Sequence, residues 1–337
     1  MFNNKTILIT GGTGSFGKKI IKRLLNDYKP KKIIIYSRDE LKQYNLQSEL
    51  FKFKKQLRFF IGDVRDLPRL KKSFEKVNYV IHAAALKHVP VAEYNPFEAV
   101  KTNIIGTQNV VEASLEMGVE KVISLSTDKA SSPVNLYGAT KLTADKLVVA
   151  GNYHKGTVVT KLSVVRYGNV FGSRGSIVPH LLNFKKDEKF PVTDVNMTRF
   201  SITLNDSVNF VLNCFKNMWG GEIFIPKIPS YKLVDLIKAL LSSNKIKIIG
   251  IRPGEKIHEE MISINEALNT LECEDRYIIC PSPEFIEWNF KKYKKNFKAK
   301  ICKDNFSYNS NKNKFLKISE LKKMVKNNIK DFELGNK

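Results

Sequence analysis

The sequence predicts an α/β protein with a doubly wound, largely parallel sheet and a smaller C-terminal domain. Over the first 170 residues, short β-branched or aromatic runs alternate with helical patterns. Beyond residue 170, prolines and glycines divide the chain into shorter pieces. Alternation of this kind is typical of a parallel sheet covered by helices on both faces. The length of 337 residues, 42% of them hydrophobic, suits about two domains and a sizeable core.

Six runs bounded by turn signals predict strands, at 6–10, 32–36, 57–61, 78–83, 121–126 and 161–166. Helical spacing of apolar residues predicts helices after the first strand, then at 96–117, 136–150 and 317–329. The basic, aromatic segment 288–300 indicates a surface loop or edge. We expect residues 1–170 to form a first domain, with later sheet strands contributed from beyond 170. Residues 171–290 would form a second, interleaved domain, and 291–337 a basic C-terminal segment.

The net charge of +24 raises the question of a nucleic-acid partner. The 57 basic residues comprise 47 Lys and 10 Arg, and forked recognition of bases or phosphates favours Arg. Residues 285–337 alone hold 15 Lys and 5 acidic residues, which is +10 of the total. We therefore expect a solvated basic surface and no nucleic-acid partner. A positive field would also attract an anionic substrate.

Several classes of protein are not expected. No apolar run approaches the ~20 residues that cross a bilayer, and residues 1–5 lead straight into a strand rather than a signal peptide. The four cysteines form no C-x-x-C motif, which indicates reduced, mostly buried thiols in a cytoplasmic protein. The five histidines show no metal-ligand spacing, so no metal is predicted.

A glycine-rich turn, TGGTGSFG at 10–17, lies between the first strand and the first helix. Such a turn lets backbone N–H groups approach a pyrophosphate, and the helix dipole adds to the attraction. The second strand is followed by Ser37 and Arg38 rather than directly by a carboxylate, which favours NADP over NAD. Alternatively, Arg38 only pairs with Asp39 or Glu40. Expected cofactor contacts are Gly11, Thr13, Gly14, Ser15, Phe16, Gly17, Ser37, Arg38, Lys42, Asp63, Val64, Ala83, Tyr137 and Lys141.

Tyr137 and Lys141 are four residues apart on a predicted helix and therefore lie on one face. A lysine beside a phenol lowers the phenol's pKa, which makes a general base that can deprotonate an alcohol. Together with the glycine-rich turn, this pair resembles the extended short-chain dehydrogenase/reductase superfamily. Asp128 and Lys129 follow the fifth strand, where open α/β sheets collect catalytic residues. They set an acid beside a potential base.

Longer stretches narrow the resemblance: YSRDELKQY (36–44), HAAALKHVPVAEYNPFEAVKTNIIGTQNV (82–110), STDKASSPVNLYGATK (126–141) and VVRYGNVFGSRGSIVP (164–179). With IGIRPGEKIHEEM (249–261), they are similar to the inverting UDP-N-acetylglucosamine 4,6-dehydratases of pseudaminic acid synthesis. The resemblance covers nearly the whole chain. His88, Ser201 and Leu268 depart from the family's pattern.

The resemblance implies UDP-N-acetylglucosamine as substrate, tightly bound NADP that is recycled, and a homo-oligomer, often a hexamer. It implies that Tyr137, assisted by Lys141, takes the proton of the C4 hydroxyl while hydride passes to NADP, and that Lys129 and Asp128 eliminate water across C5 and C6. Sequence does not divide the acid and base roles between these two residues. The implied substrate contacts are Lys87, Thr127, Asn169, Arg174, Arg199 and Arg252. The alternative activity is UDP-N-acetylglucosamine 4-epimerase, which eliminates no water.

Overall fold

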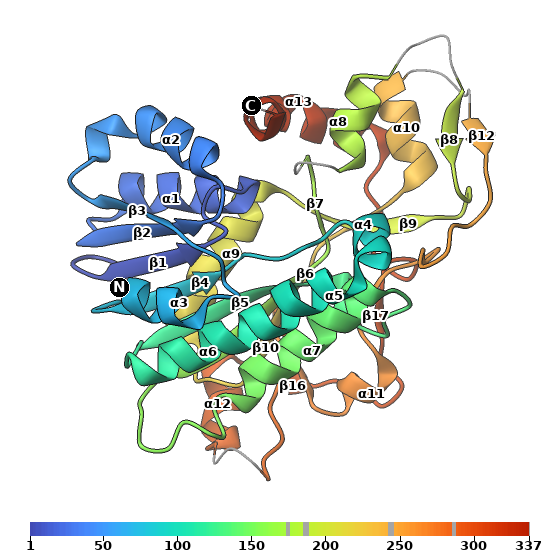
Figure 1. Ribbon diagram of the computed structural model, residues 1–337. Coiled ribbons are helices and arrows are strands. Elements are labelled where there is room, and N and C mark those ends of the chain that lie inside the picture. The colour runs from blue at the N-terminus through green and yellow to red at the C-terminus, as the bar shows by residue number, and fades with distance from the viewer. Residues whose placement is uncertain (173–175, 185–188, 242–245, 285–287, 337) are drawn as a thin grey trace.

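A ten-stranded sheet forms the centre of the molecule in the computed structural model, which describes residues 1–172, 176–184, 189–241, 246–284 and 288–336 (Figure 1). The strand order is β16-β14-β15-β10-β6-β5-β4-β1-β2-β3. The first six strands are β1 (Thr6–Thr10), β2 (Lys32–Ser37), β3 (Leu57–Ile61), β4 (Tyr79–His82), β5 (Lys121–Thr127) and β6 (Lys161–Tyr167). All six match the predicted runs to within one residue at either end.

The rest of this sheet comes from beyond residue 170. Strand β10 (Ile223–Pro226) pairs parallel with β6, and β15 (Arg276–Ile279), β14 (Thr270–Glu272) and β16 (Lys300–Ile301) continue antiparallel. Pairing from β3 through β10 is parallel throughout. The chain crosses from β3 to β4 on the far side of β1, so the sheet is doubly wound, as predicted.

Helices cover both faces because side chains alternate along each strand. Ile7 and Ile9 point to a core shared with α1 (Ser15–Asp27), α2 (Glu40–Glu49) and α9 (Leu204–Asn217). Leu8 points to the opposite core, which is shared with α3 (Leu67–Phe74), α6 (Gly106–Glu116) and α7 (Leu136–Ala150). Figure 1 shows the two helical layers on opposite sides of the sheet.

The predicted helix over 96–117 is not one continuous α-helix. It consists of α5 (Pro96–Val100), a π-helical turn η2 (Lys101–Ile105) and α6, and a short α4 (Val89–Tyr94) precedes them. The Asn103 side chain accepts from Leu86 N at 2.8 Å and donates to Leu86 O at 2.9 Å. The widened turn therefore places an amide that ties this helix to the loop after β4, a use typical of π-helical turns near functional sites.

A smaller lobe stands beside the carboxyl ends of the strands (Figure 1). It contains the sheet β11-β9-β7 (Ser230–Lys232, Thr198–Ile202, Asn169–Val170) and the pair β12-β8 (Ile246–Ile248, Phe190–Val192). Its helices are α8 (Ile177–Leu182), α10 (Leu233–Leu241) and the C-terminal α13 (Ile318–Asn336). The final helix thus begins one residue later than predicted and runs further. Leu236, Ile237 and Leu321 lie in the lobe's own core.

A short helix, η1 (Phe51–Phe53), lies between α2 and β3. The remaining short elements are η3 (Asp128–Ala130) after β5, α11 (Ile264–Ala267) and the pair β13-β17 (Glu260–Ile262, Tyr308–Asn309). The prediction of a loop or edge at 288–300 is wrong for most of that segment. Residues Phe290–Asn296 form α12, and Tyr293 is fully buried against Trp219 and Trp288. Aromatic burial outweighs the local density of lysines there.

The four cysteines are free and buried, in agreement with the expectation of reduced thiols. Across the part of the chain that the structure describes, no helix has the length and apolar character needed to cross a bilayer.

Candidate functional site

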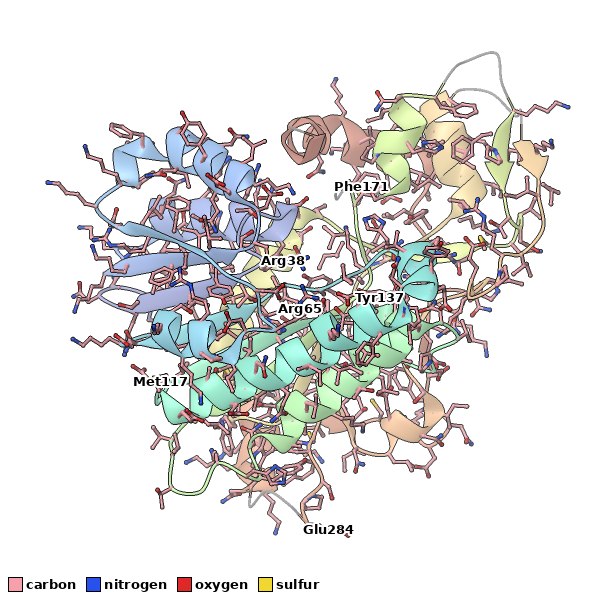
Figure 2. All side chains as sticks on the ribbon, viewed as in Figure 1. Arg38, Arg65, Met117, Tyr137, Phe171 and Glu284 are labelled. Atoms are coloured by element: carbon pink, nitrogen blue, oxygen red, sulfur yellow. The ribbon has the colours of Figure 1, made fainter. Side chains whose placement is uncertain are left out.

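A cleft of about 710 Å³ opens at the carboxyl ends of the parallel strands, between the sheet and the smaller lobe. Open α/β sheets bind ligands at this edge, where the strand order reverses. Every predicted cofactor contact lines the cleft, and so do Lys87, Thr127, Lys129 and Asn169 among the other predicted site residues. Arg38 after β2, Arg65 after β3 and Tyr137 on α7 all lie toward the centre of the molecule (Figure 2).

The glycine-rich turn forms one end of the cleft. Gly11 has a φ of +65°, and a Cβ on it would lie 2.9 Å from the backbone of Ala83. A Cβ on Gly17 would lie 2.5 Å from Gly12 O, so only glycine lets α1 begin this close to β1. Gly14 is the N-cap residue of α1, and it has no side chain that could cover the start of the helix. Backbone N–H groups and the positive end of the helix dipole therefore face the cleft. This is a suitable site for a pyrophosphate.

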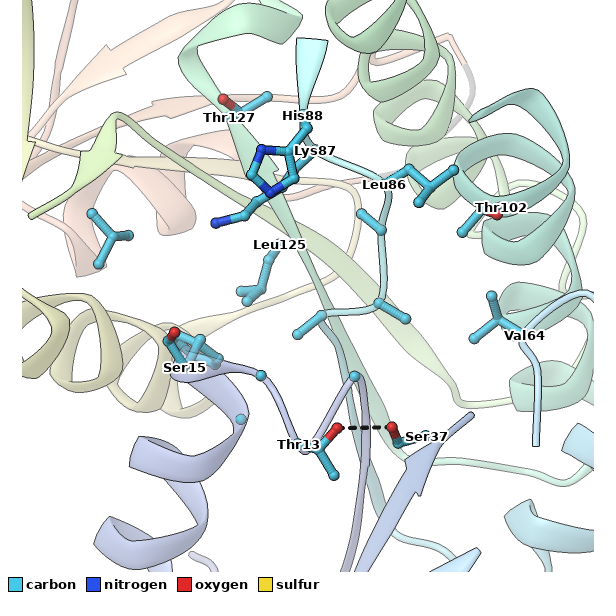
Figure 3. Close-up of a pocket in the computed structure, with 18 of the residues that line it drawn as sticks. Thr13, Ser15, Ser37, Val64, Leu86, Lys87, His88, Thr102, Leu125 and Thr127 are labelled. Atoms are coloured by element: carbon cyan, nitrogen blue, oxygen red, sulfur yellow. Dashed lines mark hydrogen bonds between the residues drawn. The ribbon is translucent and has the colours of Figure 1, made fainter. Parts of the chain in front are cut away.

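The end of β2 carries a hydroxyl and a guanidinium. Ser37 Oγ and Thr13 Oγ1 are 2.8 Å apart, which connects β2 to the glycine-rich turn (Figure 3). Arg38 pairs with Asp63, at 3.3 Å, and its side chain is 54% exposed. Asp39 caps α2 by accepting from Lys42 N at 2.9 Å and also pairs with Lys42 Nζ. The first carboxylate after β2 is thus engaged in the helix start.

Asp63 and Val64 line the next part of the cleft. Arg65 donates to Asp63 Oδ2 at 2.7 Å, and despite burial the hydrogen bonds from Arg65 and the charge of Arg38 hold the pKa of Asp63 below its usual range. Asp63 does not cap the following helix; the N-cap of α3 is Asp66, whose side chain accepts a hydrogen bond from Arg69 N. Asp63 therefore remains an ionised acceptor at the cleft wall.

Tyr137 and Lys141 both line the cleft from the first turns of α7. Lys141 Nζ donates to Leu125 O at 2.8 Å. Burial raises the pKa of Tyr137 to about 12, and the cation that opposes this rise is Lys129, helped by the Thr127 hydroxyl. The expectation that Lys141 lowers the pKa of the phenol stays a prediction. Burial lowers the pKa of Lys141 itself, which Asp145 partly offsets.

Lys129 stands among three oxygens. Its Nζ lies 3.0 Å from Asp128 Oδ1, 3.2 Å from Asn169 Oδ1 and 3.2 Å from Glu259 Oε1. Asp128 is fully buried behind the cleft wall, so it reaches the cleft only through Lys129 and Thr127. Burial lowers the pKa of Lys129, but Asp128 and Glu259 outweigh it and raise the value above the ordinary one. Lys129 is thus an ammonium in the free protein.

The predicted substrate contacts fall into three groups: residues that line the cleft, residues that do not, and one residue outside the described part of the chain. Lys87, Thr127 and Asn169 line the cleft. Figure 3 shows Lys87 and His88 on the same side of the cleft as Thr127. Arg199 does not line the cleft; its guanidinium donates to Thr198 O and Ile257 O and faces Glu259. Arg252 is exposed on the loop before β13 and does not line the cleft either. Arg174 lies outside the described residues.

Sequence reasoning missed three contributors to the site. Asn103 holds the Leu86 backbone, Asn135 caps α7 by accepting from Gly138 N at 2.8 Å, and Glu259 contacts Lys129. Asn135 directly before the helical pattern was a readable N-cap signal. Asn103 and Glu259 lie inside quoted motifs, but only the tertiary structure brings them to the site.

The chain is similar to known proteins over most of its length. Residues 7–281 match the model of a family described as Polysaccharide biosynthesis protein. A relative from Campylobacter jejuni named UDP-N-acetylglucosamine 4,6-dehydratase (inverting) is 57% identical over 320 residues, covering 93% of this chain and 94% of the relative. A relative from Rickettsia rickettsii named UDP-glucose 4-epimerase is 41% identical, covering 96% of each chain.

Among solved structures, the X-ray structure of Pen from Bacillus thuringiensis has a TM-score of 0.87 to this chain at 41% identity. The match covers 98% of this chain and 99% of Pen. The sequence resemblance to the inverting dehydratases and the predicted α/β fold class are both confirmed.

Proposed function

Because this chain belongs to the polysaccharide biosynthesis protein family, within the extended short-chain dehydrogenase/reductase superfamily, we propose that it is a UDP-N-acetylglucosamine 4,6-dehydratase that inverts C5. The observation that carries the proposal is the Asp128–Lys129 pair at the cleft beside Tyr137. An enzyme that only oxidises and reduces C4 needs one base, whereas loss of water needs a second acid–base pair. A relative 57% identical to this chain bears the name of this dehydratase.

The cleft suits a nicotinamide dinucleotide, and we propose NADP, tightly bound and recycled. The N–H groups at the start of α1 would hold the pyrophosphate, and Ser37, Arg38 and Lys42 would hold a 2′-phosphate. Asp63 would accept from the adenine amino group, and Val64 and Ala83 would line the adenine and ribose path. When bound, the nicotinamide would accept a hydride from C4 and return it to C6, while C5 takes up a proton on its opposite face and is thereby inverted.

The chain's own residues would do the proton chemistry. Tyr137, as phenolate, takes the proton of the C4 hydroxyl, with Lys141 beside it. The ketone at C4 then acidifies the proton on C5. Lys129 and Asp128 remove that proton and protonate the departing 6-hydroxyl. Lys87, Thr127 and Asn169 would contact the sugar nucleotide, while Arg174, Arg199 and Arg252 stay predictions from the resemblance.

A mass measurement tests the proposal. Incubation of the protein with UDP-N-acetylglucosamine should give a product lighter by one water, and NMR should place C5 in the L configuration. A product of unchanged mass would instead favour a 4-epimerase, the alternative supported by the 41% identical relative named UDP-glucose 4-epimerase. We place the activity in the cytoplasm, in the first step of pseudaminic acid-type glycan synthesis.

We also propose a homo-oligomer, with a hexamer as the state that the family resemblance implies. Large apolar side chains stand exposed on α4 and α5, including Tyr94, Phe97 and Val91, and Tyr94 is 87% exposed. Light scattering of the purified chain would measure the state, and a monomer at working concentration would refute it.

A further inference from the structure

A buried histidine that the proposed mechanism does not use, His82, is the last residue of β4 and directly precedes a wall of the cleft. The residue is 2% exposed, and its ring lies between two threonine hydroxyls. His82 Nδ1 is 2.7 Å from Thr10 Oγ1, and His82 Nε2 is 3.1 Å from Thr107 Oγ1. Thr10 ends β1 at the glycine-rich turn, and Thr107 lies on α6 just beyond η2. One imidazole thus joins the glycine-rich turn to α6.

The hydrogen bonds of Thr10 determine which ring nitrogen of His82 carries the proton. Thr10 Oγ1 accepts from Ala83 N at 3.2 Å and from Ala84 N at 3.3 Å. A hydroxyl oxygen has two lone pairs, so only its own proton remains for the bond to His82 Nδ1. Nδ1 is therefore an acceptor, and in a neutral ring the proton lies on Nε2.

The hydrogen bonds of Thr107 require the same tautomer independently. Thr107 Oγ1 lies 2.6 Å from Asn103 O, and because a carbonyl oxygen cannot donate, the threonine proton points to it. Thr107 Oγ1 is then left to accept from His82 Nε2–H. Burial and the charge of Lys141 lower the pKa of His82 to about 3, so the ring stays neutral. The hydrogen bonds through His82 thus run in a single direction, from the loop after β4 to η2.

The same network holds both ends of segment 83–86. At one end the first two N–H groups of the segment donate to Thr10. At the other end the Asn103 side chain accepts from Leu86 N and donates to Leu86 O. Residues 83–86 all line the cleft, where the dinucleotide would pass. The position of this wall therefore depends on the hydrogen bonds that meet at His82.

The network continues to the helix of Tyr137. The Asn103 amide also donates to Thr140 Oγ1 at 3.0 Å, and Thr140 in turn donates to Tyr137 O at 2.8 Å. Asn103 and Thr140 are each 1% exposed, and hydrogen bonds shielded from water in this way hold their groups firmly. The cleft wall and the proposed general base are thus aligned by one set of buried bonds.

We propose that His82, as the neutral Nε2–H tautomer, is a positioning residue that fixes segment 83–86 against the dinucleotide and in line with Tyr137. The inference rests on the nicotinamide dinucleotide of the proposed function. His82 does not itself line the cleft and acts through Thr10 and Asn103. The other tautomer would set an N–H against a hydroxyl whose lone pairs are taken and would leave Nε2 without a donor. Unpaired buried polar groups of this kind are costly.

Nitrogen NMR of the full-length protein, labelled at its five histidines, tests the tautomer without any turnover. The signal of His82 is the one that is lost in His82→Gln. We expect a protonated Nε2, an unprotonated Nδ1 and no titration over the range in which ordinary histidines titrate. A proton on Nδ1, or a titration in that range, would overturn the inference.

Calorimetric titration with NADP and with NAD tests the positioning. Thr107→Val keeps the shape of the side chain but removes the acceptor of His82 Nε2–H. We expect it to weaken binding of either dinucleotide about tenfold and to lower kcat for water loss by a similar factor, whereas Thr107→Ser, which keeps the hydroxyl, should restore both. Ser114→Ala is the matched control, because Ser114 on the same helix also donates to the carbonyl four residues back at 2.6 Å. It should leave binding and kcat unchanged.

A merely structural role of Thr107 would lower the free energy of unfolding in Thr107→Val and leave dinucleotide binding as it is in the wild type. That result would overturn the inference. If Thr107→Val does not fold, Thr140→Val still decides, because it breaks the link to Tyr137 O; it should lower kcat, and a wild-type kcat would count against the inference. A wild-type protein with the expected histidine signal that binds the dinucleotide but removes no water would instead overturn the proposed function.

Discussion

At the scale of single residues, burial sets the proton chemistry more than sequence spacing does. Tyr137 and Lys141 lie on one face of α7, yet Lys141 bonds to Leu125 O while Lys129 supplies the cation that acts on the phenol. A phenol pKa of about 12 leaves little phenolate at neutral pH in the protein alone. In the proposed mechanism, the charge on this side of the cleft therefore governs the first proton transfer.

Removing the phenol hydroxyl should stop the reaction at its first step. We expect Tyr137→Phe to lower consumption of UDP-N-acetylglucosamine by about 10²- to 10⁴-fold, since a positioned general base is lost. In the wild type, the rate should rise with pH on the acid side, because only the phenolate accepts a proton. Tyr153→Phe, beyond the C-terminal end of α7, is the control; equal losses in the two variants would contradict the role of Tyr137.

Replacing Lys129 should abolish dehydration without abolishing substrate binding. Lys129→Ala removes the proposed base at C5, so water loss measured by mass spectrometry should stop while the variant still binds UDP-N-acetylglucosamine in calorimetry. Full turnover by the variant would reject the role.

We expect the Arg38 side chain to set the preference of the protein for NADP over NAD. Arg38→Ala should weaken NADP binding about tenfold, or about 1.4 kcal/mol, and leave NAD binding nearly unchanged, because the guanidinium would meet only a 2′-phosphate. Calorimetric titration with each dinucleotide measures both. Arg23→Ala, an arginine on α1 paired with Asp27, is the control. Equal weakening for both dinucleotides would argue against NADP selectivity.

At the scale of elements, the strands and the starts of helices were predictable, and the irregular turns were not. Gly11 and Gly17 permit the close approach of β1 and α1 that a glycine-rich turn announces in sequence. The π-helical turn η2 was missed, because residues 96–117 read as one helix and Asn103 gains its partner Leu86 only in three dimensions. The burial of Tyr293 in α12 likewise depends on Trp219, far along the chain.

The junction of η3 and α7 holds Lys129 near Tyr137 through a glycine. A Cβ on Gly138 would lie 2.2 Å from Lys129 O, so Gly138→Ala must displace one of the two elements. We expect a loss of about 1–3 kcal/mol in the free energy of unfolding, and a fall in kcat larger than stability explains. Chemical denaturation and steady-state kinetics measure the two effects.

Gly151→Ala, at the other end of α7, provides the comparison. Its Cβ would come closest to a side chain, with Val111 Cγ1 at 2.8 Å, whereas the backbone atom Val148 O would lie at an ordinary contact distance of 3.5 Å. We expect Gly151→Ala to lower the free energy of unfolding and to leave kcat unchanged. A Gly138→Ala variant with unchanged kcat would show that the junction does not position the site.

At the scale of the whole molecule, a buried arginine joins the main sheet to the C-terminal half. Arg166 on β6 is fully buried and contacts Asp145 on α7 at 3.2 Å and Glu266 on α11 at 2.8 Å. It also donates to Met261 O at 3.0 Å. Removing one partner of such a network leaves a buried charge without compensation, which is more costly than the pair is stabilising.

Glu266→Gln should therefore lower the free energy of unfolding at neutral pH by about 3 kcal/mol. Burial raises the pKa of Glu266, but Arg166 and the Ser263 N–H outweigh it and hold the value below 4.5. A lowered pKa stabilises the folded state above the unfolded value, and the gain is lost as pH falls through the folded value. The difference between wild type and variant should thus narrow below about pH 4.5.

Denaturant unfolding across pH checks this expectation. Glu284→Gln, an exposed position, is the control and should change stability by less than about 0.5 kcal/mol (Figure 2). A constant difference between wild type and Glu266→Gln from neutral to acid pH would contradict the assignment of an ionised Glu266.

The strand runs, the glycine-rich turn and the helical spacing of Tyr137 and Lys141 could be read directly from the sequence, because these features depend on residues a few positions apart. Other contacts became apparent only from the fold: Glu259 contacts both Lys129 and Arg199, Arg38 pairs with Asp63, and Lys141 bonds to a strand. The physical reason is that burial and charge act through space, and the neighbours that set them come from distant parts of the chain.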